Sequence, residues 1–277
     1  MADQTMLCPD PESLSIQPLL NIRAPDSCVT VIARRGYGKS YLFSSWLYHQ
    51  MKDTKRSFNQ GNVIIFSSTG RLSNQFSFLS KENCRPFSEK TLVSVLKLQQ
   101  RKKSMIISRA DRRYRATGKR ESVTFSPLII GLDDVQSMTG RATDGTKGSF
   151  HSDAINFAMT CGRHLGVVLF QCIQSPKSLS SVVARSQTTH LCMAGLSAEQ
   201  LKVCYTLTDG TVDFKTFSRM VASCGRHCFL LFDTTKPHGE RFNYIKAPPF
   251  SQFQLRIKPH ATSKQSTKKK NGAEEEK

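Results

Sequence analysis

Residues 33–40, ARRGYGKS, contain the residue types that bind a phosphate chain. Glycine accepts positive φ without steric cost, so backbone N–H groups in this stretch can turn toward phosphate oxygens. The ammonium of Lys39 would reach the β- and γ-phosphates, and the hydroxyl of Ser40 would ligate Mg²⁺. We therefore expect a nucleoside triphosphate to be held by six consecutive residues: Arg35, Gly36, Tyr37, Gly38, Lys39 and Ser40.

The segments on either side of this loop have the patterns that the chemistry requires. Residues 28–32, CVTVI, are apolar and mostly β-branched, which is typical of a buried strand. Residues 39–51 repeat apolar side chains at helical spacing. A strand, a glycine-containing loop and a helix in this order direct a helix N-terminus at an anion, so the sequence predicts a phosphate-binding loop.

A second chemical element is the pair of carboxylates in LIIGLDD, residues 128–134. The apolar run 127–132 predicts a buried strand that ends at Asp133 and Asp134, where an open α/β sheet binds its ligands. We expect Asp133 to hold Mg²⁺ through water. Asp134 would polarise the water that attacks the γ-phosphate.

A third element is the apolar run 166–170, GVVLF, which predicts a strand ending at Gln171. A polar side chain at the tip of the strand beside Asp133 could sense the γ-phosphate or orient water. The order of the three elements implies an additional strand between the phosphate loop and the carboxylate strand. Apolar strands alternating with helices predict an α/β fold, a RecA-like P-loop NTPase with a mainly parallel central sheet flanked by helices.

The composition limits the class of protein. Among 277 residues, 40 are Lys or Arg and 21 are Asp or Glu, a formal net charge of +19, which favours a polyanionic partner. No apolar run is long enough to span a membrane, and residues 1–13 lack the pattern of a signal peptide, so we expect an intracellular protein. Nine scattered cysteines indicate reduced thiols, and their spacing to histidine matches no common zinc site.

The chain divides into three parts by composition. Residues 1–26 are expected to be an irregular extension, residues 27–250 the P-loop ATPase domain, and residues 251–277 a charged, disordered tail. Within the ATPase domain, a helix is expected over 89–103. The segment 101–126 that follows is dense in Arg and Lys and is interpreted as a basic insertion.

These stretches together resemble a known family. ARRGYGKS, LIIGLDD, CGRHLGVVLFQCIQSP and the later CFLLFD are similar to segments of the genome-packaging ATPases of poxviruses and other large DNA viruses, in the HerA–FtsK superfamily. The resemblance covers roughly residues 28–246. Relatives have Gly at the position of Ala33 and often Ser or Thr at that of Tyr37.

The resemblance implies ATP hydrolysis with Mg²⁺, a ring of identical subunits, and translocation of double-stranded DNA into a preformed capsid. A capsid or portal protein is then a further expected partner, and no membrane is. The expected location is the cytoplasm or nucleus of a host cell at sites of virus assembly, or the virion itself.

In a ring, an arginine from a neighbouring subunit can stabilise the charge on the transferring phosphoryl oxygens. Arg163, in the Gly-Arg segment that matches the family, is the first candidate for this role. Arg185 is the second candidate, either across the subunit boundary or as a sensor within the subunit. An ordinary salt bridge or an exposed side chain is the alternative for each.

DNA contacts are expected from basic loops that grip phosphates without reading bases. One candidate is the segment 101–120, with Arg112, Arg113 and Arg115, for which a solvated, poorly ordered insertion is the alternative. The other is the loop 139–150, which contains Arg141 and Lys147 and follows the carboxylate strand. Lysines 268–270 could add contacts, or could simply keep the tail in solution.

Two other functions compete with genome packaging. One is a related FtsK- or HerA-like DNA translocase of a plasmid, cell or mobile element, which the sequence hardly distinguishes from a packaging motor. The other is a nucleotide-binding kinase. The paired carboxylates and the polar strand tip count against the kinase.

Overall fold

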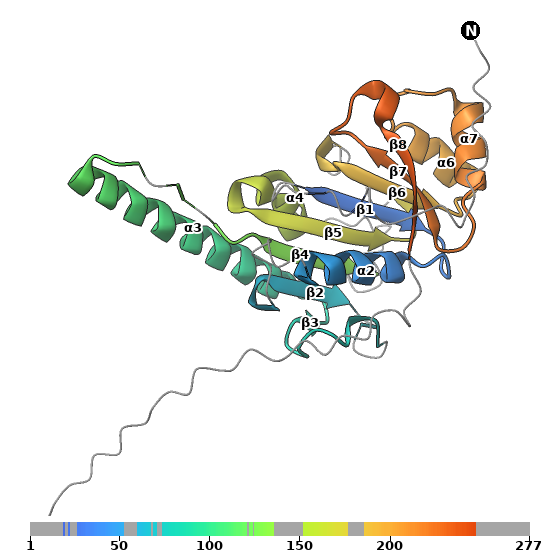
Figure 1. Ribbon diagram of the computed structural model, residues 1–277. Coiled ribbons are helices and arrows are strands. Elements are labelled where there is room, and N and C mark those ends of the chain that lie inside the picture. The colour runs from blue at the N-terminus through green and yellow to red at the C-terminus, as the bar shows by residue number, and fades with distance from the viewer. Residues whose placement is uncertain are drawn as a thin grey trace, which may run out of the picture.

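We analysed a computed structural model of the chain (Figure 1). The residues that it describes are Leu19, Ile22, 27–52, 60–67, 69–70, 74–120, 122–123, 125–135, 152–176 and 186–247. Of the predicted site residues, Arg141, Lys147 and Arg185 lie outside this set, as do the expected tail and most of the N-terminal extension.

The described residues form one eight-stranded sheet, in the order β3-β2-β4-β5-β1-β6-β7-β8. Its six strands from β3 to β6 are parallel, and β7 and β8 continue it in antiparallel fashion. The strands are β1 (Cys28–Ala33), β2 (Val63–Ser67), β3 (Cys84–Arg85), β4 (Leu128–Asp133), β5 (Val167–Ile173), β6 (His190–Ala194), β7 (Cys228–Asp233) and β8 (Phe242–Lys246). Strand β5 lies between β1 and β4, which confirms the predicted additional strand and the mainly parallel sheet.

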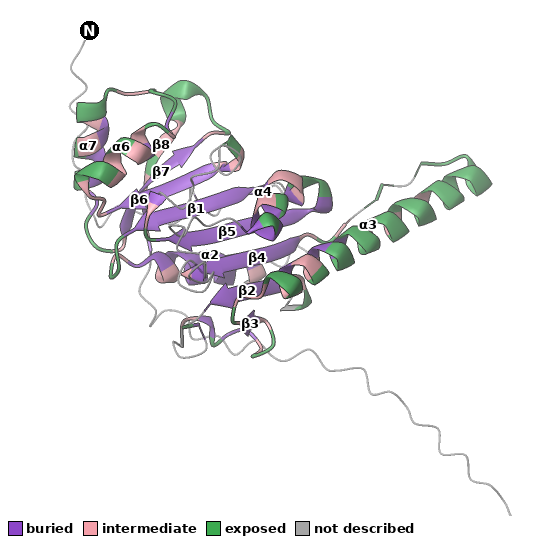
Figure 2. Ribbon diagram, turned by 180° about the vertical axis from the view of Figure 1, so that it is seen from behind, coloured by how far each residue is buried: buried purple, intermediate pink, exposed green. Residues whose placement is uncertain are grey.

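Helices cover both faces of this sheet. They are α2 (Lys39–Lys52), α3 (Glu89–Thr117), α4 (Asp153–Leu165), α6 (Ala198–Tyr205) and α7 (Phe214–Ala222), with short 3₁₀ turns η1 (Gln60–Asn62), η2 (Asn74–Phe76) and η5 (His238–Glu240). Helix α2 packs on one face, and α3 and α4 lie side by side on the other (Figures 1 and 2). No helix in the described ranges is long and apolar enough to cross a membrane.

The packing of α2 explains the glycine in LIIGLDD. The ring of Phe43 stacks on that of Phe170 from β5, with centroids 4.4 Å apart, and Trp46 packs beside them. A Cβ at Gly131 would lie 2.2 Å from the Phe43 ring, so only glycine lets this ring settle on β4. The contact fixes the first turn of α2 against the end of β4.

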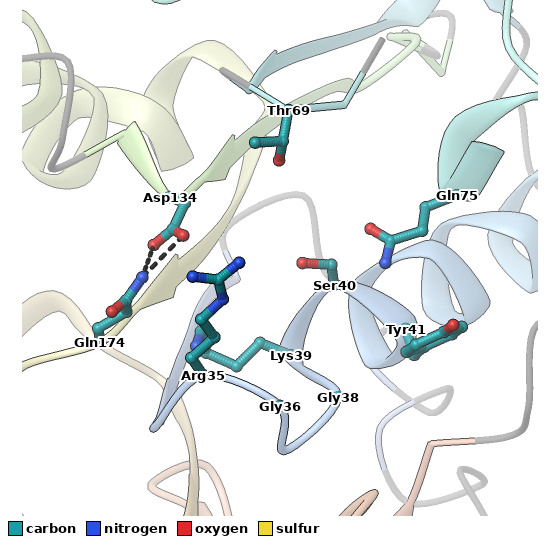
Figure 3. A pocket seen from close by; sticks show the side chains of 10 residues that line it. All are labelled: Arg35, Gly36, Gly38, Lys39, Ser40, Tyr41, Thr69, Gln75, Asp134 and Gln174. Atoms are coloured by element: carbon teal, nitrogen blue, oxygen red, sulfur yellow. Dashed lines mark hydrogen bonds between the residues drawn. The ribbon is translucent and has the colours of Figure 1, made fainter. Parts of the chain in front are cut away.

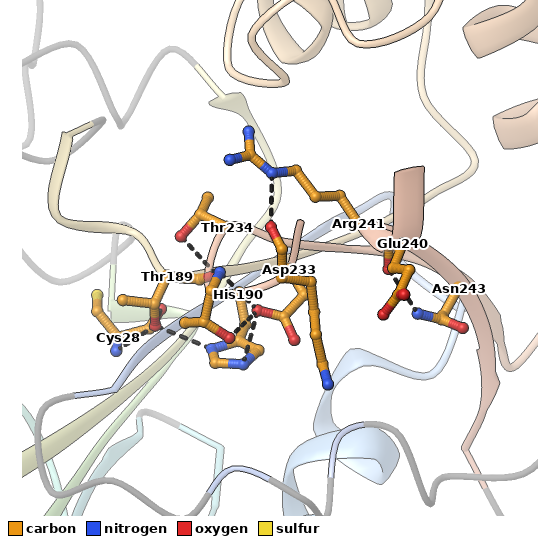
Figure 4. A network of polar contacts seen from close by, with 10 residues as sticks. Cys28, Thr189, His190, Asp233, Thr234, Glu240, Arg241 and Asn243 are labelled. Carbon is orange, nitrogen blue, oxygen red and sulfur yellow. Dashed lines mark hydrogen bonds and ion pairs between the residues drawn. The ribbon is translucent and has the colours of Figure 1, made fainter. Parts of the chain in front are cut away.

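A polar network ties the amino end of β1 to β6 and β7 (Figure 4). The hydroxyl of Thr189 accepts from the backbone N–H of Cys28 at 2.9 Å and donates to its carbonyl at 3.0 Å. The buried imidazole of His190 lies 3.4 Å from the carboxylate of Asp233. The strand that leads into the phosphate loop is therefore anchored at its far end.

Helix α3 corrects one sequence prediction. The helix was expected to end near Lys103, but it continues to Thr117. The added stretch, residues 104–117, contains four arginines, two alanines and a methionine, which are favourable helix residues. Gly118 ends the helix in the left-handed conformation with φ 67°. The basic segment is therefore largely a helix and not a loop.

Candidate nucleotide-binding site

The predicted phosphate loop and carboxylates meet at one cavity at the carboxyl ends of the central strands (Figure 3). The cavity has a volume of about 540 Å³. Its lining residues come from the loop, the start of α2, the segment after β2, and the ends of β4 and β5: Arg35, Gly36, Gly38, Lys39, Ser40, Tyr41, Thr69, Gln75, Asp134 and Gln174.

The loop has the backbone conformation that its glycines allow. Gly36 and Gly38 have φ of 87° and 91°, which other residues rarely adopt. The buried ammonium of Lys39 donates to the carbonyl of Ala33 at 2.8 Å, so the loop curls around this side chain. Ala33 itself is the last residue of β1, an extended conformation that alanine adopts without strain. The missing first glycine therefore leaves the loop geometry intact.

Tyr37 departs from the family pattern, and a glycine accommodates it. A Cβ at Gly195, just after β6, would lie 2.3 Å from the Tyr37 ring, so this ring packs directly on the glycine backbone. The carbonyl of Tyr37 accepts from the backbone N–H of His227 at 3.0 Å. A Cβ at Gly38 would lie 2.4 Å from the His227 ring. The turns before α6 and β7 thus support the outer side of the loop.

This packing predicts that Gly195→Ala disturbs the phosphate loop. The new methyl group would clash with Tyr37, and we expect ATP affinity to fall roughly tenfold or more, from overpacking of about 1–3 kcal/mol. Gly210→Ala is the matched control, because Gly210 has a similar φ of 63° but open space around a Cβ. Tyr37→Ser should restore binding to Gly195→Ala, measured as the Kd for ATP. Equal losses in the two alanine variants would contradict the contact.

Ser40 and Asp133 are brought together as predicted for a shared metal ion. The Ser40 hydroxyl donates to one oxygen of Asp133 at 3.0 Å, and Ser67 at the end of β2 donates to the other at 3.2 Å. The pKa of the Asp133 carboxyl is raised above its usual value, because the effect of burial exceeds the lowering by the hydrogen bonds from the two serines. A hydroxyl and a carboxylate at hydrogen-bond distance form the all-oxygen donor set that Mg²⁺ prefers.

Asp134 lies on the cavity wall in an unusual conformation. Its φ is 54°, in the left-handed region that non-glycine residues seldom occupy. The side-chain amide of Gln174 donates to both of its carboxylate oxygens at 2.8 Å (Figure 3). Strained backbone of this kind concentrates at functional sites, and here it turns the carboxylate toward the phosphate loop.

Gln171 does not take the position predicted for it. Strand β5 continues to Ile173, so the prediction that the strand ends at Gln171 is wrong. The Gln171 side chain is buried and donates to the hydroxyl of Thr30 on β1 at 2.7 Å. The polar residue that follows the strand and lines the cavity is Gln174.

Of the predicted arginines that the structure describes, Arg35 lines the cavity and the other four lie away from it. Arg163 is exposed in the last turn of α4, where its Nε donates to the ring of His164 at 3.3 Å. Because Gly166 connects α4 to the start of β5, Arg163 lies at the amino edge of the sheet, opposite the cavity. Arg112, Arg113 and Arg115 are exposed on the distal half of α3.

Five residues at the cavity were not predicted: Tyr41, Thr69, Gln75 and Gln174, which line it, and Ser67, which contacts Asp133. Ser67 ends β2 directly after the apolar residues 63–66 and pairs with Asp133 of β4, so a polar residue at the end of an apolar run was the available signal. Gln174 follows the strand whose end was placed too early. Thr69 lies just after β2 and Gln75 in the short turn η2, and neither stands in a recognisable sequence pattern, so no sequence signal identifies them.

Comparison with known proteins supports the fold. No family model matches the chain, and no curated protein matches it in sequence. The genome packaging NTPase B204 from Sulfolobus turreted icosahedral virus 2, in complex with AMPPCP, matches with a TM-score of 0.50 at 14% identity, over 82% of this chain and 100% of that chain. Its complex with sulfate matches with a TM-score of 0.50 at 15% identity, over 81% and 98%.

A further similar structure is that of a different ATPase. EssC (ATPases 2 and 3) from Geobacillus thermodenitrificans matches with a TM-score of 0.51 at 12% identity, over 80% of this chain and 39% of that chain. At these identities the likeness is one of fold. It confirms the prediction of a RecA-like P-loop NTPase fold.

Proposed function

We propose that the protein is an ATP-driven motor that moves double-stranded viral DNA into a capsid. The observation that carries this proposal is one cavity lined by Lys39, Ser40 and Asp134, with the buried Asp133 hydrogen-bonded to Ser40 behind it. The same fold occurs in the packaging NTPase B204. The basic composition adds support, since a packaging motor acts on a polyanion.

The cavity residues have distinct roles in hydrolysis. Backbone N–H groups of the loop and the Lys39 ammonium bind the phosphates and stabilise the charge that develops on the γ-phosphoryl oxygens. Ser40 and Asp133 would hold Mg²⁺, which supplies neutralisation of charge between the β- and γ-phosphates when bound. Asp134 positions the attacking water and accepts its proton, with its carboxylate oriented by Gln174.

Arg163 is proposed to act on the site of a neighbouring subunit. It lies at the edge of the sheet opposite its own cavity, so it cannot reach its own nucleotide. In a head-to-tail ring, the amino edge of one subunit faces the cavity of the next, and Arg163 can then stabilise the transferring phosphoryl group. Arg185, outside the described residues, is the second candidate.

A packaging role implies two partners, DNA and a capsid, and a location in the host cell. Double-stranded DNA would be bound without sequence preference, through the basic residues of α3 and those of loop 139–150. A capsid or portal protein would hold the ring at sites of virus assembly in the host cell. The second candidate function is that of a related FtsK- or HerA-like DNA translocase, since EssC shares the fold as well.

Displacement of a third strand tests the proposal. A motor that moves along a duplex strips a bound triplex-forming oligonucleotide from it, whereas a nucleotide-binding kinase does not. We expect displacement that requires ATP and a duplex track beside the triplex. Packaging is then separated from other translocation by whether procapsids of the same source take up DNA in the presence of the protein.

A further inference from the structure

Helix α3 is the longest α-helix of the described structure and the one with the largest share of exposed residues. Its first half packs on α4 and includes the buried Leu92, Leu96 and Gln99. Its second half projects past the amino ends of β4 and β5 (Figures 1 and 2). At 29 residues and about 1.5 Å per residue, the helix is about 43 Å long. It is a rigid rod rather than a mobile loop.

The basic side chains of α3 gather on one side of this rod. At about 100° per residue, eight of its nine lysines and arginines fall within about 160° of the circumference. All eight are exposed: Lys90, Lys97, Arg101, Lys102, Arg109, Arg112, Arg113 and Arg115. We call these eight residues the basic stripe. The two acidic residues of the helix, Glu89 and Asp111, fall outside it.

The side of α3 opposite the basic stripe is partly buried. The ninth basic residue, Lys103, is half-buried and donates to the carbonyl of His164 at the end of α4. Ile106 and Ala110 continue the line of buried positions and are themselves half-buried. Four large apolar side chains of α3 are also exposed: Leu98, Met105, Ile107 and Tyr114. At about 100° per residue, the first two fall within the basic stripe and the other two on the opposite side, so they form no continuous apolar face of the kind with which a helix enters lipid. The exposed side is therefore suited to a polyanion in water.

We infer that the basic stripe binds the sugar–phosphate backbone of duplex DNA along the length of α3. This inference rests on the proposed function and assigns its DNA contact to one surface. Duplex DNA carries one charge per about 1.7 Å of axis, so a 43 Å stripe faces a dense row of phosphates. The projecting half lies at the sheet edge opposite the subunit's own nucleotide cavity, so DNA on the stripe leaves that cavity open to ATP.

Neutralising four residues of the stripe tests this assignment. The variant combines Arg101→Gln, Arg109→Gln, Arg112→Gln and Arg113→Gln, because glutamine preserves helix propensity and most of the side-chain length. The matched control removes the same charge from exposed lysines and an arginine elsewhere: Lys202→Gln, Lys215→Gln, Arg219→Gln and Lys236→Gln. Circular dichroism and melting temperature show whether both variants keep the wild-type fold.

The measurement is binding to a random-sequence duplex of about 40 base pairs at several salt concentrations. We expect the stripe variant to bind at least about tenfold more weakly, and the slope of log K against log salt to shrink by roughly 3 to 4. The control should change the slope much less. Equal losses in the two variants would overturn the assignment, because they would reflect net charge alone.

A second probe separates DNA from lipid. Vesicles containing anionic phosphatidylserine are offered to wild type and to both variants. Vesicle binding that depends on the stripe, with DNA binding unaffected by it, would overturn the inference in favour of a membrane surface. Wild-type protein that binds no duplex at all would overturn the proposed function itself, whereas duplex binding that survives loss of the stripe overturns only this inference.

Discussion

Replacing Lys39 by alanine is expected to abolish ATP hydrolysis, with a loss of at least about a hundredfold in turnover. The loop is built around this ammonium, which donates to the carbonyls of Ala33 and Arg34 and lines the cavity. Arg35, the other cation in the described lining, has an exposed side chain, so the buried ammonium of Lys39 is expected to make the main contact with the β- and γ-phosphates. Phosphate release measured against ATP concentration gives the result.

Lys202→Ala, on the exposed side of α6, is the control for this loss. If Lys39→Ala hydrolysed ATP at the wild-type rate, the assignment of residues 33–40 as a phosphate loop would be wrong.

Mixing Lys39→Ala with Arg163→Ala adds a test of the ring. In mixed rings, an intact Arg163 can complete the intact loop of its neighbour, so some hydrolysis should return. If rings shown to be mixed stay inactive, Arg163 does not act across the boundary.

Asp134→Asn should leave ATP bound but slow its hydrolysis by roughly 10²- to 10⁴-fold. An asparagine keeps the shape of the side chain and tolerates the positive φ of 54°, but it cannot accept a proton from water. Binding and turnover therefore separate, and the two are measured as the Kd for ATP and as single-turnover hydrolysis.

Asp209→Asn is the matched control, because Asp209 also has a positive φ, of 56°, and lies outside the cavity lining. It should hydrolyse ATP at close to the wild-type rate. If Asp134→Asn also kept the wild-type rate, the carboxylate would not activate water. Loss of ATP binding together with hydrolysis would instead show that Asp134 supports the nucleotide itself.

The sequence carries enough information to predict the centre of the fold and most of the cavity. The loop glycines, Lys39 and Ser40 form a local pattern whose chemistry is set by a few consecutive residues. The position of Asp133 opposite Ser40 follows from apolar strands that can only be buried in a parallel sheet. These features depend on short-range patterns, and the structure places them as expected.

Other features depend on contacts that a linear pattern does not show. The end of β5 was placed too early because Gln171 is polar, but its amide is satisfied inside the sheet by Thr30. The end of α3 was placed too early because charged residues resemble a loop when no partner helix is known. The pairing of Tyr37 with Gly195 joins residues far apart in the chain, and only the folded structure reveals it.

Displacement of a triplex-forming oligonucleotide tests the central claim, that ATP hydrolysis in this cavity moves the protein along duplex DNA. The wild-type protein should strip the third strand only when ATP and a flanking duplex track are both present. Lys39→Ala and Asp134→Asn should bind the same DNA without displacing the strand. ATP hydrolysis by the wild type with no displacement, on tracks to which binding has been demonstrated, would contradict the claim.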